Sequence, residues 1–473
     1  MNPFLSKARQ VITYKVPVIN SRFKFLFELT EGRNILTFEY KGVFKSLILY
    51  FVKDSDDVQK TVRIVYIVPR DSDGSFQAPV LEPNSVELAC QKISLAVGLI
   101  QCFMSDSLHS HGLGRKTFVA LSPCEVFHSE ISLEKSHSLT ESALWEYHAK
   151  ELLARRLADD DTKVLAVLSA TRFVNTLGRP PRDHSEMMSL TKSHGALGGG
   201  GLAMFGSGCL YAWPSLLHEV QDAFLNSSKI DSLNLMDDSG YRHTFGACFS
   251  TTLGAIIHEL GHTFDLGHTN DGIMARGFDD LHRYFTIQSS NNSCTGTDIP
   301  DVTMNGGSSH DEEILLSPTR TTRFTNFKQD GASYLQAYQQ KKELRRMVAD
   351  SGKAFWSRSC ALILSSHRWF NPVPKDTECN DVLPSLSLIG GILSVNCNGD
   401  GHVVLLELRK NDRVIGFVEV PNGPPLTPNG SGGVKGSYQE FSLDKIIVKY
   451  SETNEIVVVT STGFIWSCHY PVF

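Results

Sequence analysis

The feature that most constrains this chain is an eleven-residue motif near its middle, His258-Glu-Leu-Gly-His-Thr-Phe-Asp-Leu-Gly-His268. On an α-helix, residues i and i+4 lie one above the other, so His258 and His262 can bind one metal ion without distorting the backbone. Glu259 then lies at the flank, where it can deprotonate a water at the metal. His268 reaches the same ion only if the chain turns back soon after His262.

Three imidazoles leave the fourth tetrahedral position open, which is typical of a catalytic zinc site and not of a structural one. We therefore expect one zinc ion per chain, held by His258, His262 and His268, with Glu259 as the general base. The alternative is a surface helix with solvated side chains, but the third histidine at its fixed offset favours the metal site.

The segment before the motif supports a helix. The hydroxyl residues Ser250-Thr-Thr252 are suited to an N-cap, and the apolar residues that follow recur at helical spacing. Gly267 offers a place for the chain to reverse before the third histidine.

The motif and its surroundings resemble the metzincin clan of zinc peptidases, whose H-E-x-x-H-x-x-G-x-x-H motif precedes a turn that contains a methionine. The resemblance implies that Met274, after the turn signal Asn270-Asp-Gly272, lies in that turn beneath the metal. Asp265 stands where the clan has glycine, and two interpretations stay open. It is a variant that tolerates the left-handed conformation at a cost of roughly 1 kcal/mol, or its carboxylate bonds a ligand histidine. Tyr284 is a weak counterpart of the oxyanion-stabilising tyrosine of some metzincins.

Short segments outside the motif narrow the resemblance. Residues 272–281, 112–118 and 355–370 are similar to a eukaryotic family named "putative zinc metalloproteinases", best known from fungi, some members of which carry a C-terminal jacalin-like domain. The substrate of that family is not carried over, and the expected partner is a peptide or protein substrate because the metal motif indicates a peptidase. In metzincins an extended substrate pairs with the edge strand upstream of the active-site helix. The candidate for that strand and for substrate binding is Leu202, Ala203, Met204 and Phe205.

The hydrophobic pattern divides the chain into three parts. Alternating residues between 11 and 57 predict strands, so we expect a β-sandwich-like module over 1–57. Strands and helices alternate over 58–380, which predicts a metzincin-like catalytic domain of α/β or α+β class. Residues 381–473 are β-like and predict an all-β domain, a sandwich or a prism.

Composition limits the classes of partner and compartment. With 41% hydrophobic and 20% charged residues the chain is typical of a soluble globular protein, and its net charge of −6 argues against a nucleic-acid or membrane-surface role. The longest apolar run, 93–104, is too short for a membrane span. The first residues lack an apolar signal region, and ten cysteines occur without a C-x-x-C pair, so we expect reduced thiols and a cytoplasmic address.

The leading hypothesis for function is a zinc-dependent endopeptidase, a hydrolase. The motif fixes the chemistry and not the cleft, so an exopeptidase or another amide hydrolase stays open. A third hypothesis is a non-catalytic glycan-binding or scaffold protein with a vestigial metal site, which the intact Glu259 argues against. The C-terminal domain could bind carbohydrate, although structural support is the favoured interpretation.

Overall fold

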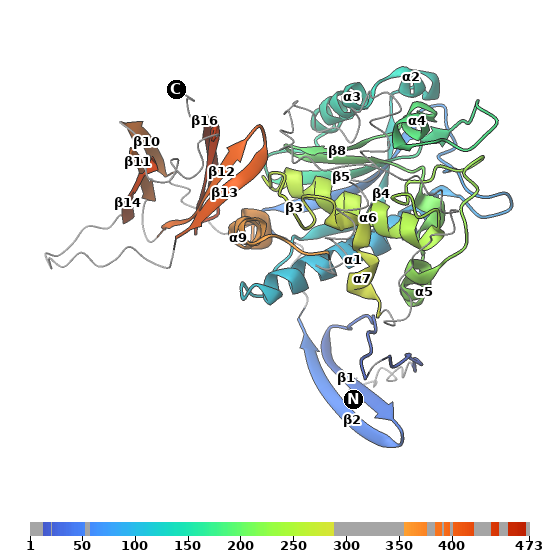
Figure 1. The fold of residues 1–473 in the computed structure, drawn as a ribbon, viewed down its shortest axis with the longest axis horizontal. Coiled ribbons are helices and arrows are strands. Elements are labelled where there is room, and N and C mark those ends of the chain that lie inside the picture. The colour runs from blue at the N-terminus through green and yellow to red at the C-terminus, as the bar shows by residue number, and fades with distance from the viewer. Residues whose placement is uncertain are drawn as a thin grey trace, which may run out of the picture.

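A computed structural model of the chain describes residues 13–19, 21–52, 57–287, 354–375, 384–389, 392–397, 401–420, 437–443 and 453–469. Its central body is a five-stranded sheet with helices on both faces (Figure 1). A β-hairpin projects from one side of this body, and two smaller sheets lie at one end of it. The mixed α/β character that the alternating pattern predicted is confirmed.

The central sheet is parallel except at one edge. In spatial order its strands are β4 (Ala120–Ser129), β3 (Thr61–Pro69), β5 (Thr162–Leu168), β9 (Leu202–Gly206) and β8 (Ala196–Gly199). Strand β8 pairs antiparallel with β9 and forms that edge, whereas the other neighbours are parallel. The interior strands are almost continuously apolar because both of their faces are covered.

Residues of one strand alternate between two cores. Ile64 and Tyr66 of β3 belong to the larger core, which also holds apolar residues of α1 (Val86–Ser110) and α6 (Phe245–Thr263). Val65 and Ile67 face the other way, into a smaller core with residues of α3 (Glu141–Ala154). The opposite orientation of successive strand residues therefore builds both layers.

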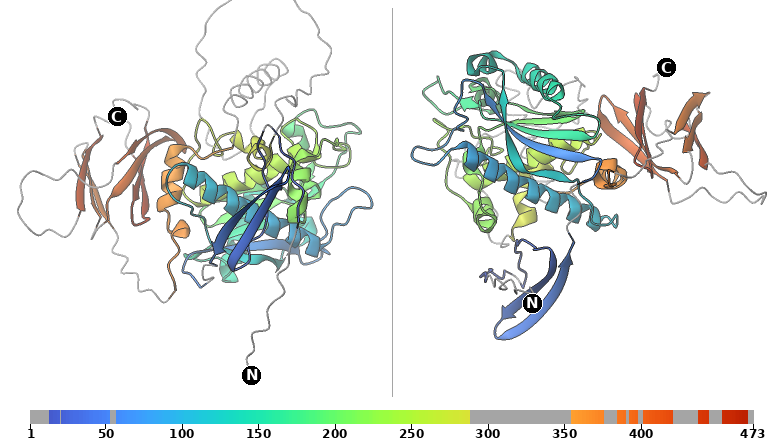
Figure 2. Two further views of the ribbon diagram at one scale, coloured as in Figure 1. Left: turned by 90° about the horizontal axis from the view of Figure 1, so that it is seen from below. Right: turned by 180° about the vertical axis from the view of Figure 1, so that it is seen from behind.

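Helix α1 is, by length and composition alone, apolar enough to cross a membrane. In the structure its apolar residues, among them Ile93, Ile100 and Phe103, are buried in the larger core. Figure 2 shows the helix lying along the central sheet. Core packing accounts for its apolar character.

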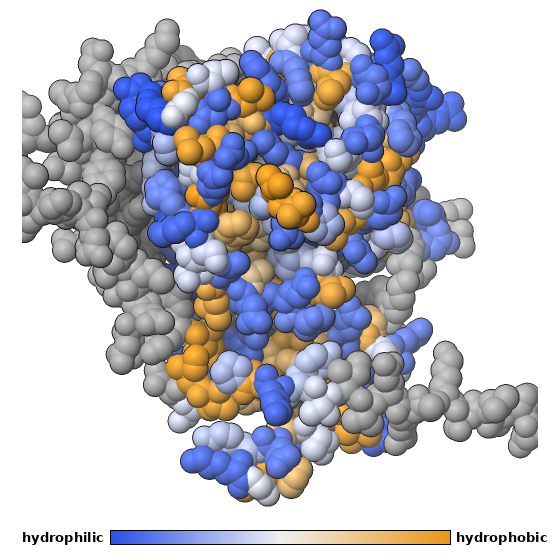
Figure 3. All heavy atoms as spheres, turned by 90° about the vertical axis from the view of Figure 1, so that its right-hand side faces the viewer, coloured by the Kyte–Doolittle hydropathy of each residue, from blue (hydrophilic) through white to orange (hydrophobic). Residues whose placement is uncertain are grey.

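The remaining elements of the central body are short. They are α2 (Leu133–Ser138), β6 (Arg172–Phe173), α4 (His184–Ser189), β7 (Thr191–Lys192), η1 (Leu210–Ala212), η2 (Leu217–Glu219), α5 (Val220–Leu225), η3 (Gly277–Asp280), α7 (His282–Phe285), α9 (Arg358–Ser366) and η4 (Arg368–Phe370). On the side of the molecule away from the C-terminal sheets, hydrophilic and hydrophobic side chains are interspersed (Figure 3).

The β-sandwich-like module expected over 1–57 is wrong for the described part of that range. It holds one antiparallel hairpin, β1 (Gly32–Tyr40) with β2 (Val43–Phe51). The phenylalanine-rich segment before it forms no strand in the described residues, and the rings of Phe25 and Phe27 stack with their centroids 5.1 Å apart. The Lys24 amine is hydrogen-bonded to backbone carbonyls of α7, which holds this segment against the central body.

The described part of the C-terminal region contains two antiparallel sheets, as its β-like pattern predicted. One contains β10 (Ser385–Ile389), β11 (Ile392–Cys397) and β14 (Ser437–Ser442), and the other contains β13 (Arg413–Glu419), β12 (Val403–Lys410), β15 (Glu455–Thr460) and β16 (Ile465–His469). Leu393 and Val395 of the first sheet share a core with Leu406 and Val458 of the second. The predicted boundary between residues 380 and 381 lies outside the described residues.

Eight of the ten cysteines lie in the described ranges, and these eight are free thiols. Cys294 and Cys379 lie outside those ranges. The expectation of reduced thiols is therefore met for these eight positions.

Candidate metal centre

Helix α6 carries the first two histidines of the motif. It begins at Phe245, earlier than the predicted cap at residues 250–252, and its N-cap is Thr244, whose hydroxyl accepts a hydrogen bond from Ala247 N at 3.3 Å. Ser250, predicted as a cap, is instead buried within the helix and donates to Asp279 O at 2.9 Å. The apolar pattern extends upstream through Phe249 to Phe245, which packs against the larger core, so the helix starts earlier than expected.

The three histidines converge as the motif predicts. Within the residues that the structure describes, His258, His262 and His268 are the group of His, Cys, Asp and Glu side chains placed to hold a metal ion, with their ligand atoms within 4.8 Å of one another. The Nε2 atoms of His258 and His262 are 3.1 Å apart. The His268 ring lies 5.2 Å from the His258 ring and 4.5 Å from the His262 ring.

The hydrogen bonds of the Nδ1 atoms show which ring nitrogens are available to bind a metal ion. Nδ1 of His258 lies 2.7 Å from Ile273 O, and Nδ1 of His262 lies 2.9 Å from Leu266 O. A carbonyl can only accept, so each Nδ1 carries the proton and each Nε2 offers a lone pair. Two lone pairs 3.1 Å apart repel unless a cation lies between them, and neutral nitrogen donors of this kind suit zinc.

Burial keeps these imidazoles in the neutral form that binds metal. Burial first, and then the neighbouring His262, hold the pKa of His258 well below its usual value. Burial together with His268 lowers the pKa of His262 to about 4. Both rings are therefore ready ligands at neutral pH.

Asp265 produces the turn that brings His268 back. Its φ is +64°, and the bonds Asp265 N to His262 O (3.2 Å) and Leu266 N to Gly261 O (3.1 Å) form a Schellman motif. The sequence predicted that the chain would reverse at Gly267, whereas in the structure it reverses at Asp265. The Asp265 carboxylate lies 3.4 Å from Nε2 of His367, which is not a ligand, so the tolerated-variant interpretation is the one that the geometry supports.

Met274 lies in a tight turn beside α6. It is 1% exposed, and a Cβ built on Gly261 would lie 2.6 Å from its sulfur atom. The turn closes through Ala275 N to Gly272 O at 3.1 Å. Its neighbour Ile273 supplies the carbonyl that orients His258. The turn therefore both packs under the motif and orients the ring of His258.

Glu259 is 3% exposed and faces the edge strand. Its Oε2 accepts a hydrogen bond from Gly198 N, in β8, at 2.7 Å. Burial raises the pKa of Glu259 to about 8, partly opposed by that hydrogen bond and reinforced by the charge of Glu141. The carboxylate can therefore gain or lose a proton near neutral pH in the absence of metal.

The expectation that Leu202, Ala203, Met204 and Phe205 form the edge strand is wrong. These residues form β9, which pairs with β5 on one side and with β8 on the other, so their backbone groups are engaged within the sheet. All four are buried. The edge strand of the sheet next to α6 is β8.

Tyr284 has another partner. Its hydroxyl donates to Asp106 of α1 at 3.0 Å, and its ring lies edge-on to Phe103 with the ring centroids 5.1 Å apart. Burial, with the nearby Cys102 and Asp106, raises the pKa of this hydroxyl. Tyr284 therefore joins α7 to α1.

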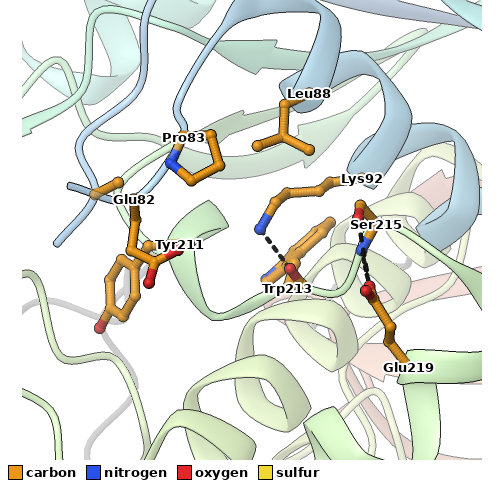
Figure 4. A pocket seen from close by; sticks show the side chains of 9 residues that line it. Glu82, Pro83, Leu88, Lys92, Tyr211, Trp213, Ser215 and Glu219 are labelled. Carbon is orange, nitrogen blue, oxygen red and sulfur yellow. Dashed lines mark hydrogen bonds between the residues drawn. The ribbon is translucent and has the colours of Figure 1, made fainter.

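A separate cavity of ≈ 290 Å³ lies between the start of α1 and the segment around η1 and η2 (Figure 4). The Lys92 amine extends to the carbonyl oxygens of Leu210 and Trp213, and burial lowers its pKa to about 8. Glu219, which also lines the cavity, accepts a hydrogen bond from Ser215 N at 3.0 Å. The three motif histidines do not line this cavity, and Lys92 and Glu219 are already hydrogen-bonded to backbone groups.

The groups that orient the imidazoles were not found from the sequence. Two are backbone carbonyls, which no motif reveals. The third is Asp412, whose Oδ2 lies 3.2 Å from Nδ1 of His268. It is 144 residues further along the chain, in the C-terminal sheets, and no sequence signal joins the two.

Comparison with known proteins gives two fungal relatives. A "putative zinc metalloproteinase" of Saccharomyces cerevisiae is 26% identical over 306 residues, 58% of this chain and 43% of that protein. Another of the same name, from Schizosaccharomyces pombe, is 28% identical over 249 residues, 48% of this chain and 39% of that protein. The chain thus spans about two fifths of the length of these relatives.

Among solved structures, wild-type OgpA from Akkermansia muciniphila aligns with a TM-score of 0.44 at 12% identity, covering 88% of this chain and 92% of that one. Catalytically inactive OgpA in complex with an O-glycopeptide substrate gives a TM-score of 0.45 at 11% identity, covering 88% and 93%. A likeness at this level carries no argument about fold or substrate.

The family comparison extends over most of the chain. Residues 5–359 match the model of a family described as "Putative peptidase family", and the predicted resemblance to fungal zinc metalloproteinases is confirmed. Because that match covers well over half of its residues, the chain belongs to this peptidase family.

Proposed function

We propose that this chain is a zinc-dependent peptidase of the metzincin type, which hydrolyses peptide bonds with Glu259 as general base. The observation that carries the proposal is the convergence of His258, His262 and His268 around one point, with Glu259 directly after the first of them. Three imidazole ligands and an open fourth position are the arrangement of catalytic zinc. One zinc ion per chain is proposed because the described residues contain one such cluster.

Glu259 performs the proton transfers. Bound zinc supplies Lewis acidity, which activates water and polarises a carbonyl oxygen. The Gly198 N–H fixes Oε2 of Glu259 at 2.7 Å, which sets the direction of the carboxylate. Glu259 accepts a proton from the attacking water and then delivers it to the leaving amine.

Strand β8 is the proposed docking site for an extended substrate. In the described part of the chain β8 is the edge strand of the sheet, and its Gly198 lies against the backbone of Glu259 in α6. Its N–H groups at Ala196 and Gly198 are bonded to Glu141 Oε1 (2.7 Å) and Glu259 Oε2 (2.7 Å). A substrate that pairs with Ala196 therefore displaces the Glu141 carboxylate.

The test of the proposed function is proteome-wide cleavage profiling of the wild type against Glu259→Gln. The variant keeps size and metal ligands but lacks the base, so we expect hydrolysis to fall by about 10²- to 10⁴-fold. Internal cleavage products that disappear in the variant establish an endopeptidase, and trimmed termini alone establish an exopeptidase. Identical profiles would leave the non-catalytic hypothesis as the better one.

The metal prediction has its own measurement. Elemental analysis of the purified chain should give about one zinc per chain, because one catalytic site takes one ion. His258→Ala and His268→Ala should lose the metal, whereas His218→Ala, which changes an exposed histidine outside the motif, should retain it. Full zinc content in both ligand variants would refute the site.

A further inference from the structure

The tip of the β12–β13 hairpin reaches the metal centre. This hairpin belongs to the C-terminal sheets, and its two turn residues, Asn411 and Asp412, have φ values of +48° and +66°. Two positive φ values in a two-residue loop are typical of a type I′ turn. Asn454 braces it by accepting from Asn411 N at 3.0 Å and donating to Asn411 Oδ1 at 2.8 Å. The turn therefore presents Asp412 in a fixed position.

Asp412 and Val414 bind the backbone of His268, and the Asp412 carboxylate also lies beside its ring. His268 N donates to Asp412 O at 2.9 Å, and Val414 N donates to His268 O at 2.8 Å, which is a short parallel bridge. The Asp412 carboxylate lies 3.2 Å from His268 Nδ1. For the other two ligands this position is occupied by the carbonyls of Ile273 and Leu266. Each of the three rings thus has an acceptor at Nδ1.

His268 needs external support more than the helical ligands do. It lies beyond the end of α6, and its side chain is 36% exposed, whereas His258 on the helix is 2% exposed. An exposed ring on a loop rotates unless an acceptor fixes it. A carboxylate also makes the coordinating nitrogen more basic than a carbonyl does.

The backbone that leads to His268 is clamped by the same hairpin. Arg409 donates to Asp265 O at 2.6 Å, and its other terminal nitrogen lies 3.8 Å from Asp412 Oδ1. A Cβ built on Gly267 would lie 2.8 Å from Arg409 Nε and 3.1 Å from Asp412 O. Glycine at 267 therefore permits the close approach of the hairpin to the metal-binding loop.

We propose that Asp412 is the positioning residue of the third metal ligand, so that the C-terminal β sheets complete the metal centre. The inference rests on the proposed function, because it requires that the three histidines bind zinc. Asp412 lies outside residues 5–359, which the family model matches. The C-terminal sheets thereby take part in metal binding as well as in structural support.

The test compares zinc affinity of full-length Asp412→Asn with that of the wild type, by competition with a chromogenic chelator. Asn tolerates the left-handed backbone, so the turn should persist while the charge is lost. Removal of such an outer-shell partner costs about 10- to 100-fold in metal affinity, and we expect Kd to rise by that factor. The cobalt-substituted variant should also show a changed visible absorption spectrum, which reports ligand geometry.

Two further variants separate positioning from folding. Glu440→Gln removes an exposed carboxylate charge from β14, away from the tip of the β12–β13 hairpin, and should leave zinc affinity unchanged, whereas Asp412→Gly should weaken it as Asp412→Asn does. Wild-type affinity in both Asp412 variants overturns the inference. The inference is also overturned if the loss of zinc-binding free energy in the Asp412 variants equals their loss of unfolding free energy in the metal-free protein. A wild type that binds no zinc would instead refute the proposed function.

Discussion

At the scale of single residues, Asp265 shows what the sequence alone could not decide. The motif predicted three ligands and a base, and the structure brings those residues together. The motif left two roles open for Asp265, which stands in place of glycine: a residue that tolerates the left-handed backbone, or a carboxylate bonded to a ligand histidine. Its φ of +64° and its contact with His367 favour the first role. The sequence could not choose between the roles, because the choice depends on the path of the backbone after the helix. The carboxylate that lies beside a motif histidine is that of Asp412, on a remote hairpin, 3.2 Å from Nδ1 of His268.

The conformation of Asp265 can be tested with two substitutions that both remove its side-chain contact. We expect Asp265→Ala to be less stable than Asp265→Gly by about 1 kcal/mol, because only alanine has a Cβ that disfavours positive φ. Urea unfolding of the two metal-free variants measures the difference. Equal stabilities would show that the turn tolerates a Cβ without strain.

The raised pKa of Glu259 predicts a pH-dependent stability. A folded-state pKa near 8 exceeds the unfolded value, so the protonated carboxyl stabilises the fold fully below about pH 4, and that contribution is lost as pH rises through 8. Metal-free Glu259→Gln should therefore match the wild type at pH 4 and be more stable at pH 9, by at most about 5 kcal/mol. Thermal unfolding at both values checks this, and a difference that grows toward acid pH would contradict it.

At the scale of elements, the sheet was predicted better than its edge. The apolar run at 202–205 indicated a strand, and its continuous burial marks it as interior. The glycine-rich stretch before it gave no strand signal, yet residues 196–199 form β8. Gly198 is required there because a Cβ would lie 2.0 Å from Glu259 O. The periodic patterns that predict strands depend on side chains, so they miss a strand selected for close backbone approach.

Two neighbouring glycines of β8 test this contact. Gly198→Ala should destabilise the protein by about 1–3 kcal/mol, the usual range for overpacking, and reduce hydrolysis, because it forces α6 away from the strand. Gly199→Ala meets no atom within 4 Å and serves as the matched control. Urea unfolding and peptide hydrolysis of both variants measure the effects. Similar results for the two variants would show that β8 yields to the added methyl group.

At the scale of the whole molecule, Arg409 ties the C-terminal sheets to the loop that leads to His268, because it donates to Asp265 O while it pairs with Glu407 of its own strand. Arg409 and Glu407 have side chains 7% and 0% exposed, with nitrogen and oxygen 2.7 Å apart. The sequence predicted an all-β region here, but it could not place that region against a motif more than a hundred residues away. Such a contact depends on how the units fold together, which local periodicity does not encode.

The ion pair predicts different outcomes for single and double substitution. Arg409→Met leaves the Glu407 carboxylate buried without its partner and removes the donor to Asp265 O, so we expect a loss of roughly 3–5 kcal/mol. Changing Glu407→Met as well removes the stranded charge, and apolar replacement of a buried pair is often close to neutral. The double variant should therefore recover most of the stability in urea unfolding. If it is as unstable as the single variant, the bond from Arg409 to the metal-binding loop, and not the buried charge, is the dominant contribution of Arg409.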